Sequence, residues 1–102
     1  MIVVTGASGH VGSNLVRALL AQGRPVRALV HRDRHALDGL DVETVSADLT
    51  DTSSLQQAFR GADVVYHLAS SISISTGNWE ELERVNVIGT RNVIDACLHN
   101  NV

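Results

Sequence analysis

Apolar runs alternate with amphipathic stretches along the 102-residue chain. Four of these runs predict strands, at residues 1–5, 26–30, 41–46 and 62–68. Continuous apolar runs are typical of parallel strands buried on both faces, whereas the alternation in the third run is typical of a strand near a sheet edge. The intervening stretches predict helices at residues 10–22, 53–60 and about 79–99. A polar connection with room for one helical turn follows the second strand, at residues 31–39.

Local signals predict where the helices begin, end and face the core. Gly23 and then Pro25 end the first helix. Asp51 or Thr52 is expected to cap the second helix, which Gly61 ends. On the first helix, the predicted buried stripe consists of Val11, Leu15, Ala18 and Leu19.

Three glycines spaced by three follow the first strand, at Gly6, Gly9 and Gly12. Gly6 lets the chain turn sharply, and Gly9, which has no Cβ, lets backbone N–H groups approach a pyrophosphate. Gly12 lets the following helix pack close to the strand. The start of that helix adds free N–H donors and a partial positive charge. A strand, a glycine loop and a helix in this order predict a nucleotide-binding site.

Strands and helices alternate in the order β-α-β-(α)-β-α-β-α, which indicates a parallel sheet with right-handed crossovers. We therefore predict an α/β fold with a Rossmann-type parallel sheet in strand order 3-2-1-4. A ligand is expected over the carboxyl ends of the strands, where the order reverses. Residues 1–102 are expected to form one nucleotide-binding domain that stops before a fifth strand.

Composition narrows the classes of function. The net charge of -3 does not favour a nucleic-acid surface. No run approaches the ~20 apolar residues of a membrane span, and Met1 leads straight into a strand, so we expect a cytoplasmic protein. The single cysteine, Cys97, allows no internal disulfide, and we predict no metal site. All 8 basic residues are arginines, so a mechanism that needs a lysine has none in this sequence.

Four motifs in order carry a resemblance to a known family. They are Thr5-Gly-x-x-Gly-x-x-Gly12, Asp48-Leu49, His67-Leu-Ala-Ser70 and Asn86-Val-x-Gly-Thr-x-Asn-Val93. With them, the chain resembles the N-terminal half of an extended short-chain dehydrogenase/reductase. This NAD-dependent epimerase/dehydratase family includes sugar-nucleotide epimerases, dehydratases and dihydroflavonol-type reductases. The resemblance implies binding of a nicotinamide dinucleotide and hydride transfer at a carbonyl or alcohol carbon.

The resemblance also implies roles for individual residues. The pyrophosphate loop would consist of Gly6, Ser8, Gly9, His10, Val11 and Gly12. Asp48 would accept a hydrogen bond from the adenine amino group, with Leu49 beside the ring. The turn after the fourth strand would lie along the adenosine and the nicotinamide ribose, through Leu68, Ala69 and Ser70. Asn86 would hold a water near the reacting centre.

Each of three assignments has a simpler alternative. Asp48 is also suited to cap the segment that follows it. Ser70 is also suited to a turn, and Asn86 to satisfying backbone groups within its own helix.

The end of the second strand bears on the choice of cofactor. An acidic residue there would accept from a ribose 2′-OH, whereas arginines would hold a 2′-phosphate. His31 stands near the place where an acid is expected, and Arg32 and Arg34 follow. We therefore predict NADP, with NAD as the alternative that Asp33 keeps open. The alternative for both arginines is a solvated loop.

The family's Tyr-x-x-x-Lys pair is missing from the sequence. Tyr66 is the only tyrosine and lies within a predicted strand. The sequence thus predicts the cofactor portion of an oxidoreductase or epimerase, without its catalytic and substrate parts. The alternative is a non-catalytic dinucleotide-binding module or cofactor sensor.

The last helix carries two apolar stripes. One consists of Leu82, Val85, Gly89, Val93 and Ala96, and the other of Val87, Ile94 and Leu98. One stripe can cover the sheet, and the other is free for a partner. The fourth strand is also an open edge with an apolar sequence. We therefore predict a homodimer through residues 79–99 or through the strand-four edge.

Overall fold

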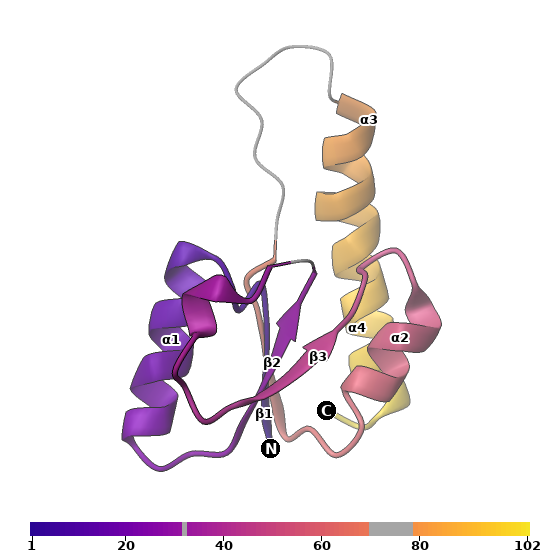
Figure 1. Cartoon of the computed structure of the whole chain (residues 1–102). Coiled ribbons are helices and arrows are strands. Elements are labelled where there is room, and N and C mark those ends of the chain that lie inside the picture. Colours follow the sequence, from indigo (N-terminus) through magenta and orange to yellow (C-terminus); the bar gives the residue numbers. More distant parts are fainter. Residues whose placement is uncertain (32, 70–78) are drawn as a thin grey trace.

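The computed structural model describes residues 1–31, 33–69 and 79–102. Four strands form one parallel sheet in the order β3-β2-β1-β4 (Figure 1). They are β1 (Ile2–Thr5), β2 (Val26–Val30), β3 (Glu43–Ser46) and β4 (Val64–His67). The predicted α/β fold and strand order are therefore confirmed.

The strand register aligns the carboxyl ends of the strands at one edge of the sheet. Thr5 pairs with His67 across β1 and β4, and Val30 pairs with Ser46 across β2 and β3. The order reverses between β1 and β4, so the two segments that leave these strands diverge from that edge. Segments that leave all four strands therefore surround a common space at this edge.

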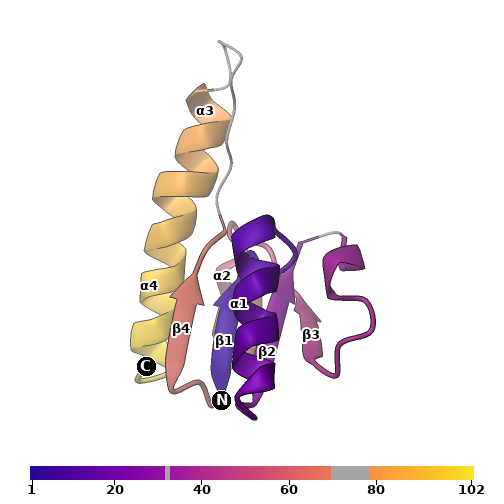
Figure 2. The same ribbon diagram turned by 90° about the vertical axis from the view of Figure 1, so that its left-hand side faces the viewer.

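Helices cover both faces of the sheet. On one face lies α1 (His10–Ala21), and on the other lie α2 (Thr52–Ala58) and a long helix (Figures 1 and 2). The long helix runs through α3 (Trp79–Leu82), a π-helical segment η2 (Glu83–Ile88) and α4 (Gly89–His99). Figure 2 shows that it continues past the carboxyl ends of the strands. A short 3-10 turn, η1 (His35–Leu37), follows β2.

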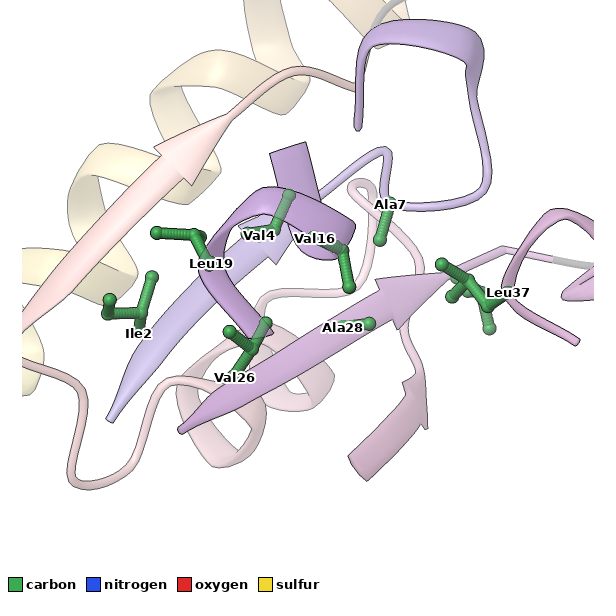
Figure 3. Close-up of a cluster of buried hydrophobic side chains, with 9 residues drawn as sticks. Ile2, Val4, Ala7, Val16, Leu19, Val26, Ala28 and Leu37 are labelled. Atoms are coloured by element: carbon green, nitrogen blue, oxygen red, sulfur yellow. The ribbon is translucent and has the colours of Figure 1, made fainter. Parts of the chain in front are cut away.

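Two hydrophobic clusters lie on the two faces of the sheet. The first packs α1 and η1 on the sheet through Ile2, Val4, Ala7, Val16, Leu19, Val26, Ala28, Val30 and Leu37 (Figure 3). The second packs α2 and α4 on the other face through Val3, Leu29, Leu55, Ala58, Phe59, Ala62, Val93 and Ala96. Strands whose alternate residues enter two cores must be apolar throughout, as the continuous runs predicted.

The predicted stripe on α1 is partly wrong. Leu19 is buried and Leu15 is half-buried, but Val11 is 65% exposed and Ala18 is also exposed. The residues of α1 that are buried are Gly12, Ser13, Val16 and Leu19. The helix starts so close to β1 that Gly12, rather than Val11, faces the sheet.

The two stripes predicted on the last helix are confirmed in α4, whereas Leu82 and Val85 of the first stripe are only half-buried. Gly89, Val93 and Ala96 are buried against the sheet side. The second stripe is exposed, with Val87 at 58%, Ile94 at 54% and Leu98 at 70%. Strand β4 lies at the edge of the sheet, as predicted, and Val64 and Tyr66 on it are each 41% exposed.

The predicted helix boundaries hold within two residues. Asp51, rather than Thr52, is the N-cap of α2, and its Oδ1 accepts from the Ser54 N–H at 3.3 Å. Gly23 and Gly61 have φ of +73° and +78° after the first two helices, a backbone conformation that glycine adopts without strain. None of the described helices has both the length and the apolar character needed to cross a membrane.

Candidate functional site at the carboxyl end of the sheet

A cavity of about 510 Å³ opens where the strands end. Its volume lies within the range that small-molecule sites occupy. Most of the residues predicted for the site line it together, namely Gly6, Ser8, Gly9, His10, Val11, Gly12, His31, Asp48, Leu49, Leu68 and Ala69. Arg34 is exposed and does not line it, and Arg32 and Ser70 lie outside the described residues.

The glycine loop brings β1, α1 and the turn after β4 into close contact. Gly6 has φ of +66°, and a Cβ built on it would lie 2.6 Å from the Ala69 nitrogen. A Cβ on Gly12 would overlap the Gly6 carbonyl. These contacts leave no room for a side chain at either position, so both glycines are needed for the shape of the cavity wall.

The first turn of α1 offers unpaired donors to the cavity. Gly9 is the N-cap, with no side-chain cap and no acidic residue in the first turn. The Gly9 N–H bonds to the Gly6 carbonyl, and the Ser13 N–H bonds to the Gly9 carbonyl. The N–H groups of His10, Val11 and Gly12 have no acceptor within the helix, because they precede its first turn of hydrogen bonds. This is the arrangement in which a helix start binds an anion.

Asp48 lies on the opposite wall of the cavity, after β3. Its Oδ1 accepts from the Thr50 N–H at 2.9 Å and from the Thr50 hydroxyl at 2.8 Å. These hydrogen bonds lower the pKa of Asp48 below its ordinary 3.8, and the charges of His31 and Arg84 act in the same direction. Asp48 is therefore an anion whose Oδ2 is left to accept a bond. It does not cap α2, since Asp51 does.

The wall beside Asp48 is apolar. Leu49, Leu29 and Leu55 line the cavity there, and Val85 of η2 is a further lining residue. A charged acceptor next to an apolar slot can hold a flat, partly polar ring such as a base. The sequence prediction assigned Val85 only to the stripe facing the sheet.

The segment after β2 brings one further side chain to the cavity. His31 lines the cavity at the end of the strand. Asp33 Oδ1 accepts from the His35 N–H at 2.8 Å and so stabilises the start of η1. Arg17 of α1 donates to the Ala36 carbonyl at 2.7 Å, which holds this segment against the helix.

Sequence reasoning missed two polar residues near the site. Thr5, fully buried at the end of β1, accepts from the N–H groups of Leu68 and Ala69 at 3.1 and 3.2 Å. These two N–H groups are thus already paired. Thr90 of α4 donates to the Asn86 carbonyl at 2.7 Å. A hydroxyl directly before the first glycine, inside an apolar strand, was the one available signal for Thr5.

Comparison with known proteins identifies a family and individual proteins to which the chain is similar. The model of the family described as "NAD dependent epimerase/dehydratase family" matches residues 2–102. The chain is 53% identical over 91 residues to a protein of Methylococcus capsulatus named sterol demethylase protein B, with 87% of this chain and 28% of that protein covered. It is 44% identical over 96 residues to a putative dihydroflavonol 4-reductase of Synechocystis, with 92% and 27% covered.

A solved structure gives the same picture. A short-chain dehydrogenase/reductase superfamily protein from Agrobacterium tumefaciens, crystallised with bound NAD, aligns with a TM-score of 0.82 and 38% identity. The alignment covers 94% of this chain and 28% of that one. The chain thus spans between a quarter and a third of the length of these three relatives. It belongs to the NAD-dependent epimerase/dehydratase family, among the extended short-chain dehydrogenases/reductases.

Proposed function

We propose that residues 1–102 form the NAD(P)-binding domain of an oxidoreductase or epimerase that transfers hydride at a carbonyl or alcohol carbon. The observation that carries the proposal is the uncapped start of α1 beside the glycine loop, in a cavity at the point where the strand order reverses. The relatives' printed names differ in substrate, so the proposal covers only the step they have in common.

The residues present fit the two ends of a dinucleotide. The N–H groups of His10, Val11 and Gly12 would bind the pyrophosphate, and Gly9 leaves space for it. Asp48 Oδ2 would accept from the adenine amino group, with the ring in the apolar slot beside Leu49. The turn at Leu68 and Ala69 would lie along the ribose on the nicotinamide side. The bound nicotinamide would supply or accept the hydride.

We propose a preference for NADP over NAD. What supports it is that His31, and not an acid, lines the cavity at the end of β2, while Asp33 is engaged with the start of η1. Arg32 or Arg34 would then hold the 2′-phosphate by charge-assisted hydrogen bonds. Replacing the arginine that binds should weaken NADPH about tenfold or more and leave NADH unchanged. Tighter binding of NADH than NADPH by the unaltered chain would contradict this preference.

A second candidate is a dinucleotide-binding module without catalysis. Its support is that the sequence has no lysine and that its one tyrosine, Tyr66, lies in β4. Both candidates predict that the chain binds the cofactor. Only the first predicts that a protein containing the chain catalyses hydride transfer. A protein that contains this chain and oxidises NADPH with a carbonyl substrate would favour the first.

We also propose that the chain pairs with a second copy through the long helix or the β4 edge. The exposed stripe of Val87, Ile94 and Leu98 and the exposed Val64 and Tyr66 on β4 support this. Unpaired backbone groups beside apolar side chains favour such pairing.

The cofactor proposal is tested by a variant of the loop. Gly9→Val places a branched side chain where the pyrophosphate would lie, and its Cβ would already be 3.3 Å from the Gly6 carbonyl. Ala18→Val adds the same side chain at an exposed position of α1 and serves as the control. Isothermal calorimetry should show NADPH binding abolished in Gly9→Val and retained in Ala18→Val. Equal binding by both would overturn the loop assignment.

A further inference from the structure

His67, at the end of β4, connects two walls of the cavity. Its Nδ1 lies 2.7 Å from Thr5 Oγ1, and its Nε2 lies 3.1 Å from Thr90 Oγ1. Thr5 Oγ1 also accepts from the N–H groups of Leu68 and Ala69, in the turn after β4. The Thr90 hydroxyl donates to the carbonyl of Asn86, which is the residue after Val85. The cavity-lining turn and the cavity-lining segment of η2 are therefore joined through one imidazole.

The proton on each hydroxyl can be assigned from its other partner. A carbonyl only accepts, so Thr90 must donate to Asn86, and its oxygen then accepts from His67 Nε2–H. At the other end, Thr5 Oγ1 accepts from the Ala69 N–H at 3.2 Å and from the Leu68 N–H at 3.1 Å, and the Leu68 nitrogen also lies 3.3 Å from the Thr5 carbonyl, which shares its proton. With the proton on Nε2, Nδ1 of the neutral ring is bare, and the Thr5 hydroxyl donates to it.

The Thr90 end requires one form of the neutral ring, and the Thr5 end fits that form. Nδ1 must be bare and Nε2 must carry the proton, which is the neutral Nε2–H tautomer. Burial also lowers the pKa of His67 from its ordinary 6.5, and burial is the cause that acts on it. The charged residues of the packed segments, Glu83 and Arg84 of η2 and Arg91 and Asp95 of α4, do not contribute to that shift.

We propose that neutral His67 is a positioning residue that locks the Leu68–Ala69 turn to the Val85–Asn86 segment and thereby sets the width of the cofactor cavity. For its effect on ligand binding, this inference rests on the proposed function. A cavity held in its binding shape before the ligand arrives binds more tightly than one that must be ordered.

The tautomer itself is measured without any substitution. Long-range ¹H–¹⁵N spectra of the 102-residue chain distinguish a bare ring nitrogen from a protonated one. The proposal predicts a single Nε2–H form of His67 that persists as the pH is lowered past 6.5. A mixture of tautomers, or the Nδ1–H form, would overturn it. This result is obtained even if a variant fails to fold.

The coupling is measured with a matched pair at a residue that does not line the cavity. Thr90→Val keeps the shape of the side chain and removes the hydroxyl, and Thr90→Ser keeps the hydroxyl. Loss of one hydrogen bond should make NADPH binding to Thr90→Val about three- to tenfold weaker and let the His67 tautomers mix. Thr90→Ser should match the unaltered chain in both respects.

The outcomes separate the two proposals. If the unaltered chain binds NADPH and Thr90→Val binds it equally well with His67 still in the Nε2–H form, the positioning role is wrong. The same holds if Thr90→Ser loses affinity as Thr90→Val does. If the unaltered chain binds neither NADPH nor NADH, the proposed function is wrong, and the tautomer spectrum alone then decides whether the lock exists.

Discussion

Asp48 illustrates what one residue reveals only in three dimensions. From the sequence, Asp48 was assigned by resemblance to accept from adenine, with capping of the following segment as the alternative. In the structure Asp51 caps α2, and Thr50 holds Oδ1 of Asp48 in the cavity wall. The sequence predicted a carboxylate at this position. The choice between its two roles required the structure, which shows that Asp51, and not Asp48, caps α2.

Asp48→Asn should weaken NADPH binding on the order of tenfold. Because Thr50 keeps the Oδ1 side of the group, the amide NH₂ of asparagine would stand where Oδ2 accepts, and would face a donor of the base. The loss corresponds to one hydrogen bond with a charged partner. Calorimetry on Asp48→Asn and on Asp41→Asn, an exposed carboxylate outside this cavity, measures it. An unchanged dissociation constant for Asp48→Asn would exclude Asp48 as a base acceptor.

His67 should make the free energy of unfolding depend on pH. Its folded pKa is lowered by burial, so the unfolded chain takes up its proton first as the pH falls. Its contribution is fully present above the unfolded value of 6.5 and is lost as the pH falls from there through the folded pKa. Denaturant titrations at a series of pH values give the free energy of unfolding as a function of pH. The slope of this free energy against pH should be shallower for His67→Gln than for His99→Gln, whose histidine is exposed. Parallel slopes would show that His67 is not the group that titrates.

At the scale of elements, periodicity predicted the helices better than it predicted their contacts. The stripe on the last helix was correct for Gly89, Val93 and Ala96 of α4, which are buried against the sheet. The stripe on α1 was partly wrong because Gly12 lets the start of the helix approach β1. The π-helical turns of η2 place Val85 in the cavity, and a regular helical wheel contains no sign of them.

The cap of α2 should be worth about 1 kcal/mol of the free energy of unfolding. Asp51→Ala removes the acceptor for the Ser54 N–H at the start of a helix of 7 residues. Ser53→Ala, at an exposed position in the same turn, is the matched control. Thermal or urea unfolding should show Asp51→Ala clearly less stable than Ser53→Ala. Equal midpoints would mean that water replaces the cap without cost.

For the whole molecule, the strand order and the position of the cavity could be predicted. Alternating elements and a first glycine loop leave few arrangements once crossovers are right-handed. The network through Thr5, His67 and Thr90 could not be predicted, because its members come from three elements and meet only when β1 and β4 are paired in register.

The apolar surface of the long helix and the β4 edge should make the chain associate. Burying ~400 Å² of apolar surface contributes on the order of 10 kcal/mol before the costs of association. Light scattering should therefore show dimers or larger species at micromolar concentration. Ile94→Glu should shift the population toward monomer, and Gln57→Glu, which adds the same charge on α2, should not. A monomeric unaltered chain would contradict the pairing.

Amide NMR can locate the bound dinucleotide on the chain residue by residue. Titration with NADPH should shift the amide signals of His10, Val11 and Gly12, together with those of Leu49 and Leu68. Signals at the opposite end of the sheet, such as Gly23 and Arg24, should stay in place. If the dinucleotide binds at the start of α1, saturable shifts are confined to the first set. Absence of shifts at the start of α1, with the fold intact, would contradict it.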